Sequence, residues 1–425
     1  DELRVCPIRL SDIERYYRRC EDMLQIPTEL RSDEKVFELA DVPKQREGGE
    51  LAYFLTRWLT EKKIRVRFMR DLKSLPNLTV VTDATVVALQ MDAAGTSIVG
   101  VRVRTQDGKS ADISCRACVL ANGTIEIARL MLHKLADGRT PVWAANRWLG
   151  RGFMDHLEGA IGEVKPRQEK LFRALFDNIY VKGMKFQPRL RVKPEAQRDK
   201  RLLNFAVHMK YNASQREHFD NAKIFFAGLL RGRFDGPVSK MPSHLLSAVR
   251  VGAPMMWHYI VNRRIFTPKG SGIELRIMVE QHQVWVRTSA LTGDVDARGL
   301  NIVALDWRVA RTKEMETVRT AAEMAKAYLE AHDMAEVEIA DSVTDPASEW
   351  IDAAVDTFHH MGATRMAESE GLGVVDSDCR VFGTDNLFIA GASVFPSAGF
   401  GNPTFTAMAL TLRLCDHLSG TLKDG

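Results

Sequence analysis

The sequence predicts a mixed α/β (α+β) protein built from two domains. Its 425 residues are more than one hydrophobic core usually organises. Segments with apolar residues at helical spacing alternate along the chain with segments of period-two strand pattern. Three strand patterns follow one another between residues 77 and 123, with tight-turn residues between them. We therefore expect helices and sheets to pack on each other in layers.

The N-terminal part is expected to be helical. Residues 10–24 predict a helix, with Ser11 as its N-cap and Glu14 completing a capping box. Residues 49–63 predict a second helix from the spacing of their apolar side chains.

A three-stranded antiparallel unit is expected next. Its strands fall in residues 77–92, 96–105 and 110–123, with Asp-Ala-Ala-Gly and Gln-Asp-Gly turns between them. A helix over residues 124–135 follows directly.

The middle of the chain predicts a mixed sheet with helices on one side. Residues 273–291 and 300–310 alternate apolar and polar side chains between turns rich in Gly and Asp. Residues 313–333 then form a long helical pattern. We find no internal repeat and no low-complexity segment.

The last fifty residues predict a strand, a turn and a helix. Residues 386–393 form a short buried strand that ends in small residues. Residues 402–418 form an amphipathic helix whose apolar face carries Phe405, Met408, Ala409, Leu412 and Cys415.

Composition excludes several classes of function. The 59 basic and 55 acidic residues are mixed along the chain and leave a net charge of +4, which gives no reason to expect nucleic acid as a partner. No apolar run approaches the ~18 residues of a membrane-spanning helix, so we expect no membrane span.

Six scattered cysteines argue against a disulfide framework and favour a reducing compartment. Cys115 and Cys118 have CxxC spacing, but no second pair completes a zinc site, so we expect both to pack structurally and expect no metal. The sequence starts at Asp1 without a signal-peptide pattern, which indicates a processed product or a piece of a longer protein. A cytoplasmic location is expected, with the periplasm as the alternative.

The start of the helix over residues 402–418 has features of a binding site. Asn402 suits the cap position and Pro403 suits the first helical turn, where its missing N–H costs nothing. Gly399 and Gly401 allow the backbone to approach a ligand closely. The positive end of the helix would favour an anion or an electron-rich ring, although an ordinary capped helix explains the same residues.

The stretch TFHHMGATRM at residues 357–366 contains two adjacent histidines. Neighbouring side chains diverge by about 100° on a helix and about 180° on a strand, so at most one of His359 and His360 can face a given target. From these residues alone, a catalytic histidine and a histidine satisfied in the core both remain possible.

The two stretches together resemble the glucose-methanol-choline (GMC) family of flavin oxidoreductases. The segments HHMGATRM, GVVDSDCRVFG, NLFIAGASVFPSAG and NPTFTAMALTLRL follow one another in the order and spacing of that family's C-terminal motifs. Weaker matches extend the resemblance over most of the chain: CPIRLSDIERYY, NLTVVTDATVVAL, VLANGTIEIARLML, WLGRGFMDHLEG and LDWRVA. Residues 165–270 match least.

The resemblance implies a two-domain fold with FAD as cofactor. Residues 1–160 and 369–425 would belong to a Rossmann-like FAD-binding domain, and residues 161–368 to a substrate domain with a mixed or antiparallel sheet flanked by helices. Family members begin with a GxGxxG turn that holds the FAD pyrophosphate, and no such turn follows a strand in this sequence. We therefore expect that segment to be missing, or to be supplied by a companion chain.

The resemblance also implies the site residues. The family's catalytic histidine falls on His359 and its second catalytic residue on Asn402, with His360 as a supporting residue. A neutral imidazole is a suitable base for a hydroxyl proton, and an amide can orient that hydroxyl. Arg365 is expected to anchor its loop. The cofactor would contact Val86, Ala121, Asn122, Gly123, Gly391, Ala392, Pro403 and Thr404.

The implied reaction is oxidation of an alcohol to a carbonyl. The histidine and asparagine pair resembles the pyranose-oxidase and sugar-dehydrogenase branch, so a secondary hydroxyl of a sugar or glycoside is the expected substrate. The electron acceptor would be oxygen, a quinone or a cytochrome. One alternative is an aliphatic, aromatic or sterol alcohol, which the apolar residues of 253–266 could accommodate. Another is a non-catalytic subunit that has lost its flavin.

Overall fold

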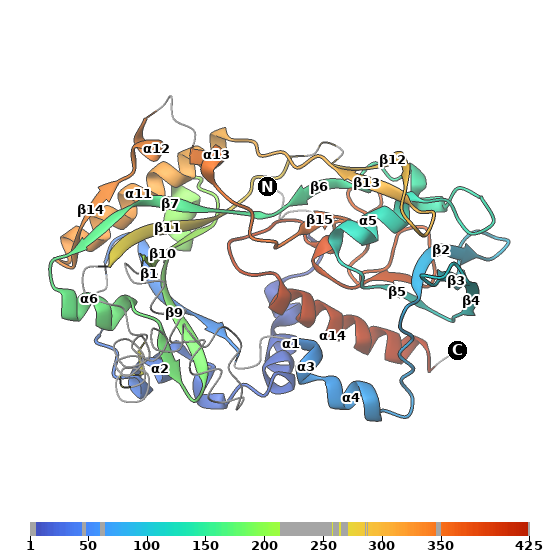
Figure 1. Cartoon of the computed structure of the whole chain (residues 1–425), viewed down its shortest axis with the longest axis horizontal. Coiled ribbons are helices and arrows are strands. Elements are labelled where there is room, and N and C mark those ends of the chain that lie inside the picture. Colours follow the sequence, from blue (N-terminus) through green and yellow to red (C-terminus); the bar gives the residue numbers. More distant parts are fainter. Residues whose placement is uncertain are drawn as a thin grey trace, which may run out of the picture.

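The computed structural model describes residues 6–44, 48–59, 64–212, 257, 263–264, 271–284, 286, 288–345 and 350–423. These residues form two lobes, a large sheet with its helices and a second group of helices around smaller sheets (Figure 1). Each lobe has its own hydrophobic cluster. The protein is a mixed α/β structure, as the sequence predicts.

A seven-stranded sheet forms the first lobe. Its order is β1-β9-β10-β11-β7-β14, with β8 also paired to β9, and its pairings are antiparallel. The bounds are β1 (Leu51–Trp58), β7 (His156–Pro166), β8 (Ile179–Val181), β9 (Met184–Val192), β10 (Phe205–Asn212), β11 (Gly272–Glu280) and β14 (Ala335–Ile339).

The two faces of this sheet differ in chemistry because successive side chains point to opposite sides of a strand. One face is apolar and packs against the helix α11 (Thr312–Ala331); the face includes Leu190, Val207, Leu275, Ile277 and Val279, and α11 contributes Ala321 and Ala325 to the same cluster. The other face, here called the polar face, carries His156, Glu158, Arg189, His208, Arg276 and Glu280. Alternation along β11, for example, places Ile277 under α11 and Arg276 on the polar face.

The second lobe contains the predicted three-stranded unit. β2 (Thr85–Met91), β3 (Ile98–Arg104) and β4 (Ser110–Ser114) pair in that order and antiparallel, which confirms the prediction. The segment expected as one strand over 110–123 divides in two, because the chain leaves β4 and forms β5 (Cys118–Leu120). β5 pairs in parallel with β16 (Leu387–Ile389), the predicted short buried strand.

Two helices flank this small parallel sheet. α5 (Thr124–Leu132) follows β5 directly, as predicted. α14 (Thr404–Thr421) follows β16 after a turn and packs beside α1 (Leu10–Met23) (Figure 1). Other elements are η2 (Thr28–Leu30), α2 (Asp33–Leu39), α3 (Ile64–Arg67), α4 (Met69–Ser74), η3 (Val142–Ala145), β6 (Arg151–Met154), α6 (Glu169–Phe176), α7 (Pro194–Asp199), β12 (Ser289–Val295), β13 (Asn301–Leu305), α12 (Asp341–Thr344), α13 (Trp350–Ala353), β15 (Met361–Ala363) and η6 (Ala392–Val394).

The helix predicted over residues 49–63 is wrong. Residues 51–58 form β1 instead, paired with β9 along its whole length. Leu51 and Leu55 are both buried, and this four-residue spacing fits one face of a helix and one face of a strand alike. Pairing with β9 settles the choice, because tertiary contacts override a weak local preference.

Details at two helix ends also differ from expectation. α1 begins at Leu10 rather than after Ser11, and Arg9 N–H donates to the Asp12 carboxylate (N···Oδ2 2.7 Å), so Ser11 is not the cap. On α14, Ala409 is buried as predicted, but Cys415 is exposed. Its neighbour Leu414 is buried in the core of the second lobe, so Cys415 lies on a different face of the helix from that core.

None of the six cysteines forms a disulfide. Across the part of the chain that the structure describes, no helix combines the length and the apolar character needed to cross a membrane.

Candidate active site

The carboxyl ends of β5 and β16 bring two groups of predicted cofactor residues together. Ala121, Asn122 and Gly123 follow β5, and Gly391 and Ala392 follow β16. The strands are parallel, and Ala390 N–H donates to the Leu120 carbonyl at 2.8 Å, so both groups lie at one edge. In sheets of this kind, ligands bind beyond the carboxyl ends of the strands.

The glycines at this edge leave room for a ligand. Gly123 has φ +86° and Gly391 has φ +145°, conformations that side chains rarely adopt. A Cβ added at either position would meet no heavy atom within 4 Å. The backbone therefore borders open space at both positions.

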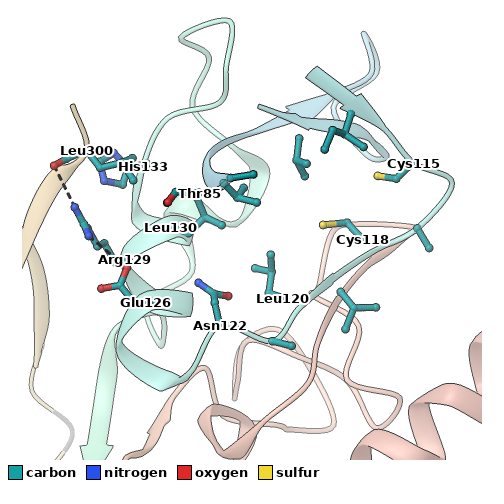
Figure 2. Close-up of a pocket in the computed structure, with 17 residues that line it drawn as sticks. Thr85, Cys115, Cys118, Leu120, Asn122, Glu126, Arg129, Leu130, His133 and Leu300 are labelled. Carbon is teal, nitrogen blue, oxygen red and sulfur yellow. Dashed lines mark hydrogen bonds and ion pairs between the residues drawn. The ribbon is translucent and has the colours of Figure 1, made fainter. Parts of the chain in front are cut away.

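A pocket of about 630 Å³ adjoins this edge (Figure 2). Val86, Ala121 and Asn122 line it, so three of the predicted cofactor residues share one space. Its polar wall includes Glu126, Arg129 and His133, and Arg129 is held by Asp296 (2.8 Å) and the Leu300 carbonyl (3.1 Å).

The predicted catalytic histidine lies in a buried hydrogen-bond cluster. Asp155, only 1 % exposed, accepts three hydrogen bonds on Oδ1: from the Thr357 hydroxyl (2.9 Å), from His359 N–H (3.1 Å) and from His156 N–H (2.6 Å). His359 Nδ1 lies 2.7 Å from Thr357 Oγ1 and 3.1 Å from His156 Nδ1. Thr357 and His359 come from one loop, and Asp155 and His156 from the junction of β6 and β7.

These contacts determine where His359 carries its proton. A carboxylate can only accept, so Thr357 must be the donor in its bond to Asp155 Oδ1, and its only hydroxyl proton is then used. Thr357 Oγ1 can therefore only accept from His359 Nδ1, which must carry the proton. In the neutral imidazole, Nε2 is then the basic atom. Nε2 makes no hydrogen bond with the described residues.

Burial keeps both histidines neutral near neutral pH. Desolvation is the main cause that lowers the pKa of His156 to about 4, and the neighbouring His359 lowers it further. Desolvation also lowers the pKa of His359, while the Asp155 charge opposes the shift. A base must be unprotonated to act, so these shifts extend the pH range in which His359 can accept a proton.

The loop that carries Thr357 and His359 contains a strained backbone position. Phe358 lies between Thr357 and His359 with φ +58°, which costs a bulky residue roughly 1–2 kcal/mol. Its side chain is 80 % exposed and packs against no core. In this conformation the Thr357 hydroxyl and the His359 backbone N–H both donate to Asp155 Oδ1.

The His360 ring has other neighbours than the His359 ring, although both residues lie beside Asp155. Its ring packs against Phe153 (centroids 5.4 Å), and its Nε2 lies 3.8 Å from Asp155 Oδ2. Its carbonyl accepts from the Thr124 hydroxyl at the start of α5 (2.8 Å). His360 thus ties the histidine loop to the edge formed by β5 and β16.

Packing explains two further residues of the same loop. Gly362 has φ +77°, and a Cβ there would collide with the Gly152 backbone on β6. Arg365 is 4 % exposed, donates from Nε to the Leu372 carbonyl (2.6 Å) and stacks over Trp148. These contacts agree with the expected anchoring role of Arg365.

The turn before α14 is tied to the polar face of the large sheet. Gly399 N–H donates to Glu280 Oε1 (3.0 Å), and Glu280 lies opposite His156 in the β11–β7 pairing. Phe400 packs against Phe54 of β1 (centroids 5.6 Å). Glu280 is thus the structural link between this turn and the histidine cluster.

Asn402, Pro403 and Thr404 follow this turn. Pro403 caps α14 and Thr404 is its first residue, one position later than predicted. The Asn402 side chain is exposed and hydrogen-bonds to nothing in the described part of the chain, so no direct contact joins it to His359.

Sequence reasoning missed Asp155, His156 and Thr357 as site residues. Thr357 and His359 are separated from the Asp155–His156 pair by some two hundred residues, so local pattern could not join them. The available signal was the adjacent Asp and His in WLGRGFMDHLEG, a segment used only for the resemblance.

Two groups of side chains in the described residues have the spacing of metal ligands: Asp155, His156 and His359, and Asp155, Asp356 and His360. Neither includes Cys115 or Cys118. The hydrogen bonds above account for the close atoms of the first group, and the absence of metal stays a prediction.

Comparison with known proteins supports the expected family. Residues 288–411 match the family model GMC oxidoreductase. These residues therefore match the C-terminal domain of the GMC oxidoreductases, in agreement with the resemblance expected from the motifs of the sequence.

Among curated proteins, the chain is similar to two C-glycoside 3-oxidases. The protein of Microbacterium trichothecenolyticum is 26% identical over 136 residues, 31% of this chain and 24% of that protein. The protein of Arthrobacter globiformis is 43% identical over 58 residues, 13% of this chain and 11% of that protein. The chain thus matches about a quarter or less of the length of these relatives.

Two solved structures are also similar. A formate oxidase has TM-score 0.47 and 18% identity, covering 83% of this chain and 62% of that chain. A pyridoxine 4-oxidase from Mesorbium loti has TM-score 0.47 and 15% identity, covering 82% and 60%.

Proposed function

We propose that the chain is the main part of an FAD-dependent oxidoreductase that converts an alcohol to a carbonyl compound, with His359 as the general base. The hydrogen-bond cluster of Asp155, Thr357 and His359 carries this proposal. It leaves Nε2 as the basic atom of a neutral imidazole and fixes the ring from the opposite side.

The residues present fit a bound FAD. Gly123 and Gly391 border open space where two parallel strands end, and Val86, Ala121 and Asn122 line a pocket beside that edge. Val86 and Ala121 to Gly123 would hold the nucleotide, and Gly391 and Ala392 the ribityl phosphate. Pro403 and Thr404 would contact the flavin ring. FAD, when bound, supplies the acceptor for the hydride that leaves the substrate carbon.

His359 and Asn402 would have different roles at the substrate hydroxyl. His359 Nε2 takes the hydroxyl proton, and the resulting positive charge is stabilised by Asp155 through Thr357. Asn402 donates a hydrogen bond to the same oxygen and orients it. The N-terminus of α14, with its free N–H groups, stabilises negative charge placed before it.

A secondary hydroxyl of a sugar or glycoside is the proposed substrate, and oxygen the proposed electron acceptor. Two of the curated relatives are C-glycoside 3-oxidases, which supports both choices over short stretches of sequence. The alternative of an apolar alcohol pocket built from residues 253–266 lies largely outside the described residues.

A flavin-reduction experiment tests the proposal. The protein is titrated with FAD, and the bound flavin is mixed without oxygen with glycosides and, in parallel, with aliphatic, aromatic and sterol alcohols. We expect glycosides to bleach the flavin absorbance and oxygen to restore it. Bleaching by another alcohol alone would replace the substrate class. A protein that binds no FAD, even together with a chain that carries the GxGxxG segment, would contradict the enzyme assignment.

A further inference from the structure

A buried arginine without an acidic partner lies on the polar face of the large sheet. Arg189 is on β9, opposite Phe54 of β1, and is 6 % exposed. One Nη donates to Gln187 Oε1 (3.1 Å) and the other lies 3.9 Å from Met278 Sδ. Its Nε is buried without a hydrogen-bond partner.

The nearby carboxylates are committed to other cations. Glu158 Oε1 lies 3.1 Å from Arg276 Nε and 3.7 Å from His208 Nε2, and Glu274 pairs with Arg276 and Lys210. No carboxylate of the described residues pairs with Arg189. Among the described residues, Arg189 is therefore a cation of the polar face to which no carboxylate is bound directly.

Other buried groups here also lack partners. His208 is 6 % exposed, and its Nδ1 has no hydrogen-bond partner. Burial is the main cause that lowers the pKa of His208 to about 3, and the charges of Arg189, Arg276, Lys210 and Lys185 lower it further. His208 is thus a neutral hydrogen-bonding group beside a cationic one.

Arg189 lies on the same face of the large sheet as His156, one of the residues of the histidine cluster. Its charge contributes to lowering the pKa of both His156 and His359. Phe54, its partner across the strands, packs against Phe400 in the turn before α14. The turn before α14 thus contacts the strand next to Arg189 through Phe54, and the strand next to His156 through Glu280.

Burying an unpaired guanidinium is costly, and proteins normally supply a carboxylate or another acceptor. Arg is also the side chain best suited to bind a carboxylate, because its planar fork matches two oxygens. Among the residues that the structure describes, an amide oxygen and a thioether are the partners of Arg189. A ligand that brings a carboxylate would complete the arrangement.

We propose that Arg189 binds the carboxylate of the substrate, so that the preferred substrate is an acidic glycoside, such as a uronoside, rather than a neutral one. This inference rests on the proposed function for the oxidised hydroxyl, and it adds a recognition site on the polar face. His208 donates or accepts one further hydrogen bond to the same ligand.

Two probes that differ in one group test the proposal: methyl β-D-glucuronide, which has a carboxylate, and methyl β-D-glucoside, which has a hydroxymethyl group instead. Binding of each is measured by calorimetry, and flavin reduction is measured separately. We expect the glucuronide to bind more tightly than the glucoside. In Arg189→Met this preference should fall by about 10- to 100-fold, the effect of losing a charge-assisted bidentate contact.

Arg167→Met is the matched control. Arg167 is on the surface, pairs with Asp333 and lies just beyond the end of β7, so this change removes the same charge elsewhere. We expect Arg167→Met to keep the preference for the glucuronide. Arg189→Lys should keep part of it, because Lys retains the charge without the fork.

Thermal unfolding separates a binding arginine from a structural one. Removing a buried unpaired charge should leave the melting temperature of Arg189→Met unchanged or higher, whereas a structural role would lower it clearly. Equal binding of the two probes by the wild type, or an unchanged preference in Arg189→Met, would overturn the proposal. Tight glucuronide binding that depends on Arg189, without flavin reduction, would keep this site and refute the proposed function.

Discussion

Asp155 accepts three hydrogen bonds from the histidine loop and β7, whereas Asn402, on the other side of the candidate site, makes none with the described residues. The first region is buried and even holds a strained backbone at Phe358. The second lies at the exposed start of a helix. The difference indicates that the chain itself orders the base, while the ligands order the hydroxyl-orienting side.

The largest expected effect concerns the base itself. His359→Ala should bind FAD normally but slow flavin reduction by ~10²-fold or more, because a general base contributes about that much. Single-turnover absorbance measurements give the rate, with His360→Ala as the control on the adjacent histidine. An unchanged rate in His359→Ala together with a loss in His360→Ala would move the role to His360.

The buried histidine pair should also make stability depend on pH. The pKa of His156 is about 4 in the fold and 6.5 ordinarily, so the unfolded chain binds the proton first as the pH falls. The stabilisation is fully present above about pH 6.5 and is lost toward pH 4, by roughly 3 kcal/mol. Denaturant unfolding at several pH values measures this loss, which His156→Gln should reduce; equal slopes in both proteins would contradict it.

A smaller effect on flavin reduction is expected from a change of Thr357, the residue that holds the His359 ring. Thr357→Val removes the acceptor for His359 Nδ1–H but keeps the side-chain shape, so the base loses its fixed tautomer. We expect flavin reduction to slow by about tenfold, or about 1.4 kcal/mol. Thr357→Ser, which keeps the hydroxyl, should stay near the wild-type rate. If both variants slowed equally, packing rather than hydrogen bonding would be responsible.

The smallest effect on the flavin is expected from a change of Asn402, at the exposed start of α14. Asn402→Asp adds a negative charge at the start of α14, which should disfavour the reduced flavin by less than about 1 kcal/mol. Spectroelectrochemistry would detect this as a lower flavin midpoint potential, and Asn402→Ala serves as the uncharged control. A potential equal to that of the wild type would argue against the role given to this helix end.

The same two regions show what sequence could predict. Local patterns were sufficient for α5, α11, α14 and β2 to β4, because each has a clear periodicity and turn residues. They failed at β1, where Leu51 and Leu55 fit a helix and a strand equally well and only the pairing with β9 decides. The family resemblance predicted His359 and Asn402 as catalytic residues. The geometry around these residues depends on contacts between segments that are distant in the sequence.

Asp155 and His156 illustrate this limit. Nothing near them in the sequence shows that Thr357 and His359 fold against them, because the contact forms only when β7 and the histidine loop meet. Arg189 is similar, since its lack of a partner is visible only once Glu158 is seen to pair with Arg276. Buried polar groups of this kind have to be found by examining hydrogen bonds in the folded chain.

The tautomer of His359 tests the central claim most directly, because the account depends on a free Nε2. Nitrogen-15 NMR of the histidine side chains, with His359→Gln used for assignment, distinguishes protonated from unprotonated ring nitrogens at neutral pH. We expect His359 to carry its proton on Nδ1 and to leave Nε2 unprotonated. A proton on Nε2 in the wild-type protein would contradict the assignment of His359 as the base.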